Sequence, residues 1–188
     1  MKKYELTGEC KVYFGVTLRR IKSLIDFSDV KKGELGGFIE KEENLSHGGD
    51  AWVYGNARVS GNARVYGDAW VYGNARVSGN ARVYGDARVS SNARVSGNAR
   101  VYDDARVSGD ARVSGNADYV LIGRIGSRFG FTTFFRNKNN EIYVSCGCFL
   151  GTLAKFRKKV KETHGTDTKY AKVYQAAADL AEMQILNK

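Results

Sequence analysis

A regular six-residue repeat occupies the middle of the chain and constrains its fold more than any other feature. Extended backbone would project the Val at the first place and the Ala at the fifth to one side, and polar side chains to the other. The Gly at the third place suits the backbone angles of a sharp corner. Each unit is therefore predicted to be a short strand followed by a bend. Eleven units run without insertion from Val53 to Asp118: VYGNAR, VSGNAR, VYGDAW, VYGNAR, VSGNAR, VYGDAR, VSSNAR, VSGNAR, VYDDAR, VSGDAR and VSGNAD.

A second period, eighteen residues long, lies inside the first. Tyr66, Tyr84 and Tyr102 recur at this spacing, so three units complete one turn of the chain. This pattern predicts a mainly β protein, a triangular parallel β-helix of about four coils. Neighbouring coils would lie about 4.8 Å apart, with equivalent side chains stacked in columns.

Composition and charge indicate what kind of partner and which cellular compartment to expect. The 188 residues include 30 Lys and Arg against 20 Asp and Glu, a formal net charge of +10. The excess is C-terminal, since residues 119–188 hold 12 basic and 5 acidic residues. Such a surface attracts acidic partners. An odd number of cysteines and an N-terminus without an apolar run predict a reduced, cytoplasmic protein, and no stretch of the sequence predicts a transmembrane helix.

Three regions are expected along the chain. Residues 1–38 are predicted to form a β-hairpin cap, residues 39–118 the β-helix, and residues 119–188 a basic α+β domain. Ile39 and Leu45 are six residues apart and resemble degenerate first units. In the last region, strands are expected at 119–125, 131–138 and 141–149, followed by a helix between Thr152 and Gly165 and a second helix from about 166–168. Both ends of the β-helix should be covered, because they would otherwise expose unpaired backbone.

Two long segments resemble known proteins. RRIKSLIDFSDVKKGELGGFIEKEENLSHGGDAWVYGNARV is similar to the N-terminal region of phage and bacterial hexapeptide-repeat proteins of the YdcK-like type. IGSRFGFTTFFRNKNNEIYVSCGCFLGTLAKFRKKVKETHG resembles a C-terminal domain that follows such repeats in phage and prophage proteins. The resemblance implies a left-handed parallel β-helix, a homo-oligomer that is plausibly a trimer, and a phage or prophage origin.

The same fold family includes hexapeptide acyltransferases, which use a histidine as general base in a cleft between neighbouring β-helices. The eleven units contain no histidine. His47 precedes them, and His164 is expected to cap a helix end. No loop that could embrace an acyl donor interrupts the repeat. We therefore expect no catalytic residue and no cofactor, with an acyltransferase based on His47 as an open alternative.

The most site-like cluster is predicted in the tail. Guanidinium groups near free amides at a strand-to-helix junction would bind an anion. The candidate residues are Arg124, Ser127, Arg128, Thr133 and Arg136.

A second candidate surface follows the stacked columns of the repeat, because a regular row of aromatic and Arg side chains suits an oligomer or partner interface. Cys146 and Cys148 are a weak zinc signal and are expected to be buried, unreactive thiols, so no metal site is predicted. The residues of the candidate partner surface are Trp52, Trp70, Tyr66, Tyr84, Tyr102, Arg88 and Arg106.

From charge and resemblance, the sequence predicts a non-enzymatic phage-type binding protein in the cytoplasm of a bacterial host cell. Its expected partner is an acidic protein, a nucleotide or a nucleic acid, with no membrane partner, and binding could block a host defence component. Two alternatives stay open: a structural, polymer-forming repeat protein, and a hexapeptide acyltransferase-like enzyme.

Overall fold

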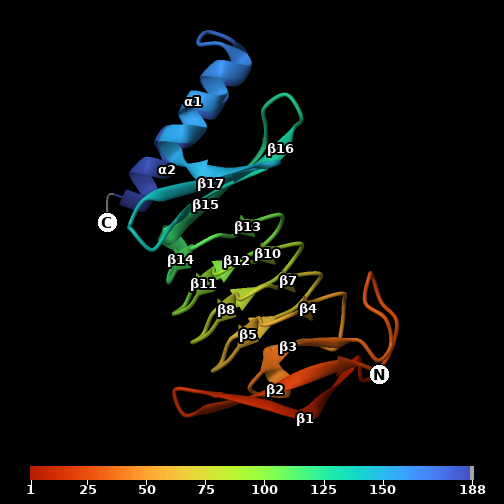
Figure 1. Ribbon diagram of the computed structural model, residues 1–188. Coiled ribbons are helices and arrows are strands. Elements are labelled where there is room, and N and C mark those ends of the chain that lie inside the picture. Colours follow the sequence, from red (N-terminus) through yellow and green to blue (C-terminus); the bar gives the residue numbers. More distant parts are fainter. Residues whose placement is uncertain (187–188) are drawn as a thin grey trace.

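The computed structural model describes residues 1–186, which form a three-sided β-solenoid with a β-rich cap at one end and an α+β region at the other (Figure 1). The N-terminal strands lie beneath the first coil, and the C-terminal sheet and helices lie beyond the last one. The predicted mainly β class and the parallel solenoid of about four coils are confirmed. Among the described residues, no helix combines the length and apolar character needed to cross a membrane.

Each coil consists of three two-residue strands separated by bends, and equivalent strands of successive coils pair in parallel. The pairing joins residues eighteen apart, as between Trp52 and Trp70. The strands are β4 Trp52–Val53, β5 Arg58–Val59, β6 Arg64–Val65, β7 Trp70–Val71, β8 Arg76–Val77, β9 Arg82–Val83, β10 Arg88–Val89, β11 Arg94–Val95, β12 Arg100–Val101, β13 Arg106–Val107 and β14 Arg112–Val113.

The N-terminal region begins with an antiparallel hairpin of β1 (Tyr4–Tyr13) and β2 (Val16–Ser23), followed by β3 (Leu35–Ile39) and the 3-10 helix η1 (Glu42–Asn44). Strand β3 pairs with β2 on one side and with β5 on the other, which places Ile39 opposite Val59. Leu45 forms a parallel bridge with Val65. Ile39 and Leu45 therefore belong to an irregular first coil, as their spacing predicted.

Three faces result from this pairing. The seven-stranded face has the order β1-β2-β3-β5-β8-β11-β14. The tryptophan face, β13-β10-β7-β4, carries the column Trp52, Trp70, Arg88 and Arg106. The tyrosine face, β12-β9-β6, carries the column Arg64, Arg82 and Arg100, with Tyr66, Tyr84 and Tyr102 directly after its strands.

Branched and small side chains fill the interior of the solenoid. Every first-place Val and fifth-place Ala from Val53 to Val113 is at most 1% exposed. The rings of Tyr66 and Tyr84 stack with centroids 4.9 Å apart, and those of Tyr84 and Tyr102 lie 5.5 Å apart. The predicted columns of equivalent residues are therefore confirmed.

The C-terminal region is an antiparallel sheet of β15 (Tyr119–Ile125), β16 (Gly130–Arg136), β17 (Ile142–Cys146) and β18 (Phe149–Thr152), followed by α1 (Leu153–His164) and α2 (Lys169–Leu186). The prediction of one strand over 141–149 is wrong, because the chain turns at Gly147, whose φ is 57°. The predicted helix boundaries are confirmed: the Thr152 hydroxyl accepts a hydrogen bond from the Lys155 N–H, and Gly165 follows α1 with φ of 76°.

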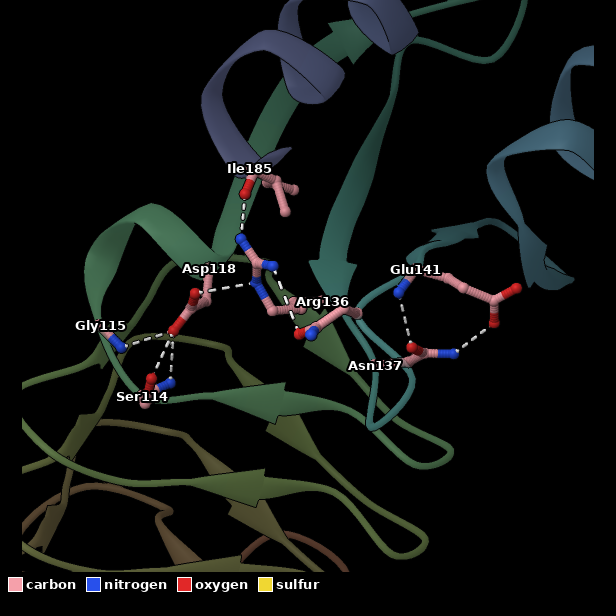
Figure 2. Close-up of polar contacts among 8 residues, drawn as sticks. Ser114, Gly115, Asp118, Arg136, Asn137, Glu141 and Ile185 are labelled. Atoms are coloured by element: carbon pink, nitrogen blue, oxygen red, sulfur yellow. Dashed lines mark hydrogen bonds and ion pairs between the residues drawn. The ribbon is translucent and has the colours of Figure 1, made fainter. Parts of the chain in front are cut away.

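A buried ion pair joins the solenoid to the C-terminal region (Figure 2). Asp118, in the 3-10 helix η2 (Asn116–Asp118), accepts hydrogen bonds from the N–H groups of Ser114 and Gly115 at 2.8 and 2.9 Å. Arg136 donates to the other oxygen of the Asp118 carboxylate at 3.2 Å and also to the carbonyl of Ile185 in α2. The last coil, β16 and α2 are thereby held together.

Both ends of the solenoid are covered, as expected. At the first coil, the Lys3 ammonium donates to the carbonyls of Gly49 and Ala51 at 2.9 and 2.8 Å. At the last coil, the Thr133 hydroxyl accepts from the Arg106 N–H at 3.0 Å. Side chains of the cap and of the C-terminal sheet therefore pair with backbone groups at both ends of the solenoid.

Candidate active site

A groove of about 640 Å³ lies between residues 42–47, which we call the His47 loop, and the tyrosine face. A histidine, His47, lies beside the solenoid here. The loop contributes Glu42, Glu43, Leu45, Ser46 and His47 to the groove, and the solenoid contributes Arg64, Val65, Tyr66 and Arg82.

Local sequence fixes the His47 loop onto the next coil of the solenoid. The Asn44 side-chain oxygen accepts hydrogen bonds from the N–H groups of Glu40 and Lys41, and its amide nitrogen donates to the carbonyl of Ala63 at 2.8 Å. Leu45 is 1% exposed within the solenoid core. The loop is thus anchored by one buried amide and one buried apolar side chain.

His47 is held on three sides. Its ring stacks on Tyr4 with a centroid distance of 4.3 Å. Its Nδ1 accepts a hydrogen bond from the Lys3 backbone N–H at 3.2 Å, so the neutral ring carries its proton on Nε2. Nε2 is buried without a hydrogen-bond partner in the described residues and lies 3.7 Å from the Glu42 carboxylate.

The groove combines carboxylates on the loop with guanidinium groups on the solenoid. Glu42 accepts a hydrogen bond from the Lys2 ammonium at 2.8 Å, and this bond, with the nearby His47, lowers the pKa of the Glu42 carboxyl. Arg64 and Arg82 lie exposed on the opposite wall. Within residues 1–186, the arginines that form ion pairs are Arg20, Arg136 and Arg157, so Arg64 and Arg82 have no carboxylate partner among the described residues.

Residues 2–4 pack against the His47 loop on the side of the N-terminal cap. The Tyr4 hydroxyl donates to the carbonyls of Glu42 and Leu45 at 2.9 and 2.8 Å. Lys3 is buried, and this burial lowers the pKa of its ammonium to about 8. Residues 2–4 therefore position His47 from the side of the cap.

The structure does not bring the predicted anion-binding residues together. Ser127 and Arg128 lie exposed in the turn between β15 and β16, with Arg124 exposed near the end of β15. Arg136 lies at the opposite end of β16, about 20 Å of extended strand from that turn, and is held by Asp118 (Figure 2). Thr133 is buried and bonded to the last coil. Anion binding by the exposed hairpin end stays a prediction.

The predicted partner surface needs one correction. Trp52 is fully buried, because Phe27 packs against it edge-on at 5.3 Å and Tyr4 lies on its other side at 6.2 Å. It cannot form part of an interface. The sequence placed it in the same column as Trp70, but could not show that Phe27, in the loop before β3, packs on Trp52. Trp70, Arg88 and Arg106 lie on the tryptophan face, and Tyr66, Tyr84 and Tyr102 lie along the tyrosine face.

Cys146 and His164, in the C-terminal region, contact neighbouring side chains of that region. Cys146 is half-buried and accepts a hydrogen bond from the Thr132 hydroxyl at 3.2 Å. Cys148 lies exposed in the turn after it, so the prediction that both thiols are buried is wrong. His164, the last residue of α1, stacks on Tyr174 with a centroid distance of 5.8 Å. Residues 1–186 contain no group of three His, Cys, Asp or Glu side chains placed to hold a metal ion.

Fold and groove together define the class of protein: a three-sided parallel β-solenoid of six-residue repeats with a histidine-containing groove at its first coils. The solenoid matches the family model described as YdcK Beta solenoid repeat, over residues 51–67, 57–73, 69–83, 75–91, 81–94, 93–109 and 105–117. The chain is also 35% identical over 82 residues to the "Uncharacterized acetyltransferase YdcK" of Escherichia coli strain K12. The match covers 36% of this chain and 25% of that protein, so the chain spans about a quarter of its relative.

This likeness corrects the functional prediction. A non-enzymatic phage-type binding protein was expected, yet the relative that shares the repeat is named as an acetyltransferase. The expectation of no enzyme is contradicted by the same finding, and the acyltransferase alternative agrees better with it.

Sequence reasoning identified His47 as the single histidine near the repeat but assigned it no partner. Its partners come from residues 2–4 and 42, and nothing in the spacing of these residues shows that β1 returns beside the loop. A tyrosine and a lysine among the first four residues carry no motif. The sequence did offer one signal of the groove: acidic residues, Glu42 and Glu43, lie on the loop, and a basic residue, Arg64, lies on the coil.

Proposed function

We propose that this chain is an acyltransferase-like enzyme that moves an acyl group from a thioester donor to an acceptor in the groove between the His47 loop and the tyrosine face. The observation that carries the proposal is the His47 ring, which lies in that groove with its Nε2 3.7 Å from the Glu42 carboxylate. The relative named as an acetyltransferase supports the reaction class.

His47 is assigned the role of general base. The acceptor's O–H or N–H gives its proton to Nδ1 of the neutral ring once the Lys3 N–H has withdrawn from that atom. The acceptor then attacks the thioester carbonyl, the carbon–sulfur bond breaks, and the proton passes from the imidazolium to the departing thiolate. Glu42 stabilises the imidazolium while it lasts, because its carboxylate faces Nε2.

The donor is assigned to the solenoid wall. Donors of the acetyl-CoA type carry several phosphate groups, and Arg64 and Arg82 present two guanidinium groups one coil apart without carboxylate partners. Glu42 and Glu43 would repel phosphates from the loop side, so the acceptor is placed there and the donor along the solenoid.

Release of free thiol from acetyl-CoA, measured with a panel of amine and alcohol acceptors, tests the proposal. His47→Ala should lower turnover by about 10²-fold or more, the usual contribution of a general base. His164→Ala is the matched control and should leave turnover unchanged. Circular dichroism checks that both variants fold. Absence of turnover and of acetyl-CoA binding in the wild-type chain, or equal turnover in His47→Ala, overturns the assignment.

Several finer expectations belong with this proposal. Left-handed winding of the coils, a trimeric assembly and a phage or prophage origin stay predictions drawn from the resemblance. A cytoplasmic location stays a prediction drawn from the cysteines and the N-terminal sequence. Measurement of the particle mass against the 20.8 kDa of one chain would test the trimer directly.

A further inference from the structure

A second, separate groove of about 300 Å³ lies on the tryptophan face. Its floor is aromatic, and its edges are polar. The turn between Phe27 and Val30 overhangs it, since these two residues bridge each other and Val30 is buried. The lining residues are Ser28, Asp29, Tyr54, Trp70, Tyr72 and Arg88.

The aromatic rings of this groove do not stack on other rings, although half-buried Trp70 packs in part against the solenoid core. On the tyrosine face, Tyr66, Tyr84 and Tyr102 stack on one another, and Trp52 is enclosed by Phe27 and Tyr4. By contrast, Trp70, Tyr54 and Tyr72 make no contact with another ring or cation in residues 1–186, and Tyr54 and Tyr72 are 43% and 36% exposed. Their faces are therefore free to contact a ligand.

The repeat itself departs from its pattern at this groove. The sixth place of the unit is Arg in nine of the eleven units and Trp only in VYGDAW, at Trp70. Along the same face the second place changes from Tyr54 and Tyr72 to Ser90 and Ser108 in the later coils. Folding does not require these aromatics, because the later coils form the same strands with Arg and Ser.

The polar edge of the groove is likewise unpaired. Asp29 and Arg88 are both exposed, and neither forms a hydrogen bond or ion pair through its side chain in the described part of the chain. The edge carries one carboxylate and one guanidinium group, so its net charge is zero. A phosphate is disfavoured there, because Asp29 would repel it.

We infer that this groove is a saccharide-binding site that takes a neutral pyranose ring of a glycan. The C–H face of such a ring packs on an exposed indole or phenol face, while its hydroxyl groups donate to Asp29 and accept from Arg88 and the tyrosine hydroxyls. A nucleotide is disfavoured because Asp29 would repel its phosphate. The inference does not rest on the proposed acyl transfer, since the two grooves lie on different faces.

The chain has two tryptophans, so two indole N–H signals report the test by NMR. Maltotriose, triacetylchitotriose and a galactose trisaccharide, each titrated to about 10 mM, cover common pyranoses in the affinity range of a small open site. At least one should shift the Trp70 signal and leave that of the buried Trp52 in place. Trp70→Arg and Tyr72→Ser restore residues that later coils carry, so both should fold. Ligand-observed NMR, which needs no Trp70 signal, should show that both variants bind about tenfold more weakly or worse.

Tyr84→Ser makes the same exchange on the tyrosine face and should bind like the wild type. Adenosine monophosphate serves as the competing class of ligand. The inference is overturned if none of the three trisaccharides shifts the Trp70 signal, if Trp70→Arg binds as tightly as the wild type, if Tyr84→Ser weakens binding equally, or if only the nucleotide binds.

Discussion

At the residue scale, the third place of each six-residue unit carries a specific backbone requirement. Glycine occupies this place in nine of the eleven units, with Ser91 and Asp103 in the other two. Both exceptions adopt the same left-handed backbone, with φ of 58° and 52°. A residue with a side chain pays a free-energy cost in this conformation that glycine avoids. Ser91 and Asp103 therefore fit the bend but should make it less stable than glycine would.

Two opposite substitutions in one column should therefore change stability in opposite directions. Ser91→Gly should raise the free energy of unfolding by about 0.5 kcal/mol, because it removes the unfavourable conformation and the Ser91 hydroxyl makes no hydrogen bond in residues 1–186. Gly109→Ser, one coil away, should lower it by a similar amount. Gly109 has φ of 66° and open space around it, so only backbone strain is tested there. Urea unfolding measures both, and changes of the same sign would contradict the argument.

At the scale of elements, the sequence predicts the repeated strands of the solenoid but not the single contacts that join the solenoid to the regions at its ends. The strands, the inward Val and Ala and the tyrosine column follow from periods of six and eighteen residues, because each position sees the same surroundings in every coil. The turn at Gly147 and the pairing of Asp118 with Arg136 occur once, so no period reveals them. The same holds for His47, whose neighbours come from the first strand, and for Trp52, which a loop covers.

The joint between η2 and β16 should be among the most sensitive points of the molecule. The side chains of Asp118 and Arg136 are 3% and 18% exposed, so loss of one leaves the other buried without its charge partner. Asp118→Ala should lower the free energy of unfolding by about 3 kcal/mol, because Ser114 and Gly115 also lose their acceptor.

Asp110 supplies the matched control. Its ion pair with Lys138 also links the last coil to the C-terminal region, but the two side chains are 38% and 52% exposed. Asp110→Ala should therefore cost no more than about 1 kcal/mol. Equal losses in the two variants, measured by urea unfolding, would mean that burial of the Asp118 pair does not determine the strength of the joint.

At the scale of the whole molecule, covered ends decide whether a solenoid remains a discrete particle. A stack of identical coils could extend by pairing with another copy at either end. Here the C-terminal sheet lies on the last coil, and the β1–β2 hairpin continues the seven-stranded face beyond the first. The outer strand β1 is itself irregular, with a register shift between Leu6 and Cys10 and charged residues beside it, which disfavours further pairing.

This arrangement argues against the polymer-forming alternative and gives a test of it. The wild-type chain should scatter light as one discrete species at all concentrations. Removal of residues 1–13 takes away β1 and leaves the edge of β2 unpaired, so this variant should grow into elongated assemblies as its concentration rises, visible by electron microscopy. Phe14→Ser, which alters only the 99% exposed tip of the hairpin, should stay discrete. Filaments of the wild-type chain would instead show that its ends are open to pairing, and a discrete truncated variant with retained β-sheet circular dichroism would show that β1 does not protect them.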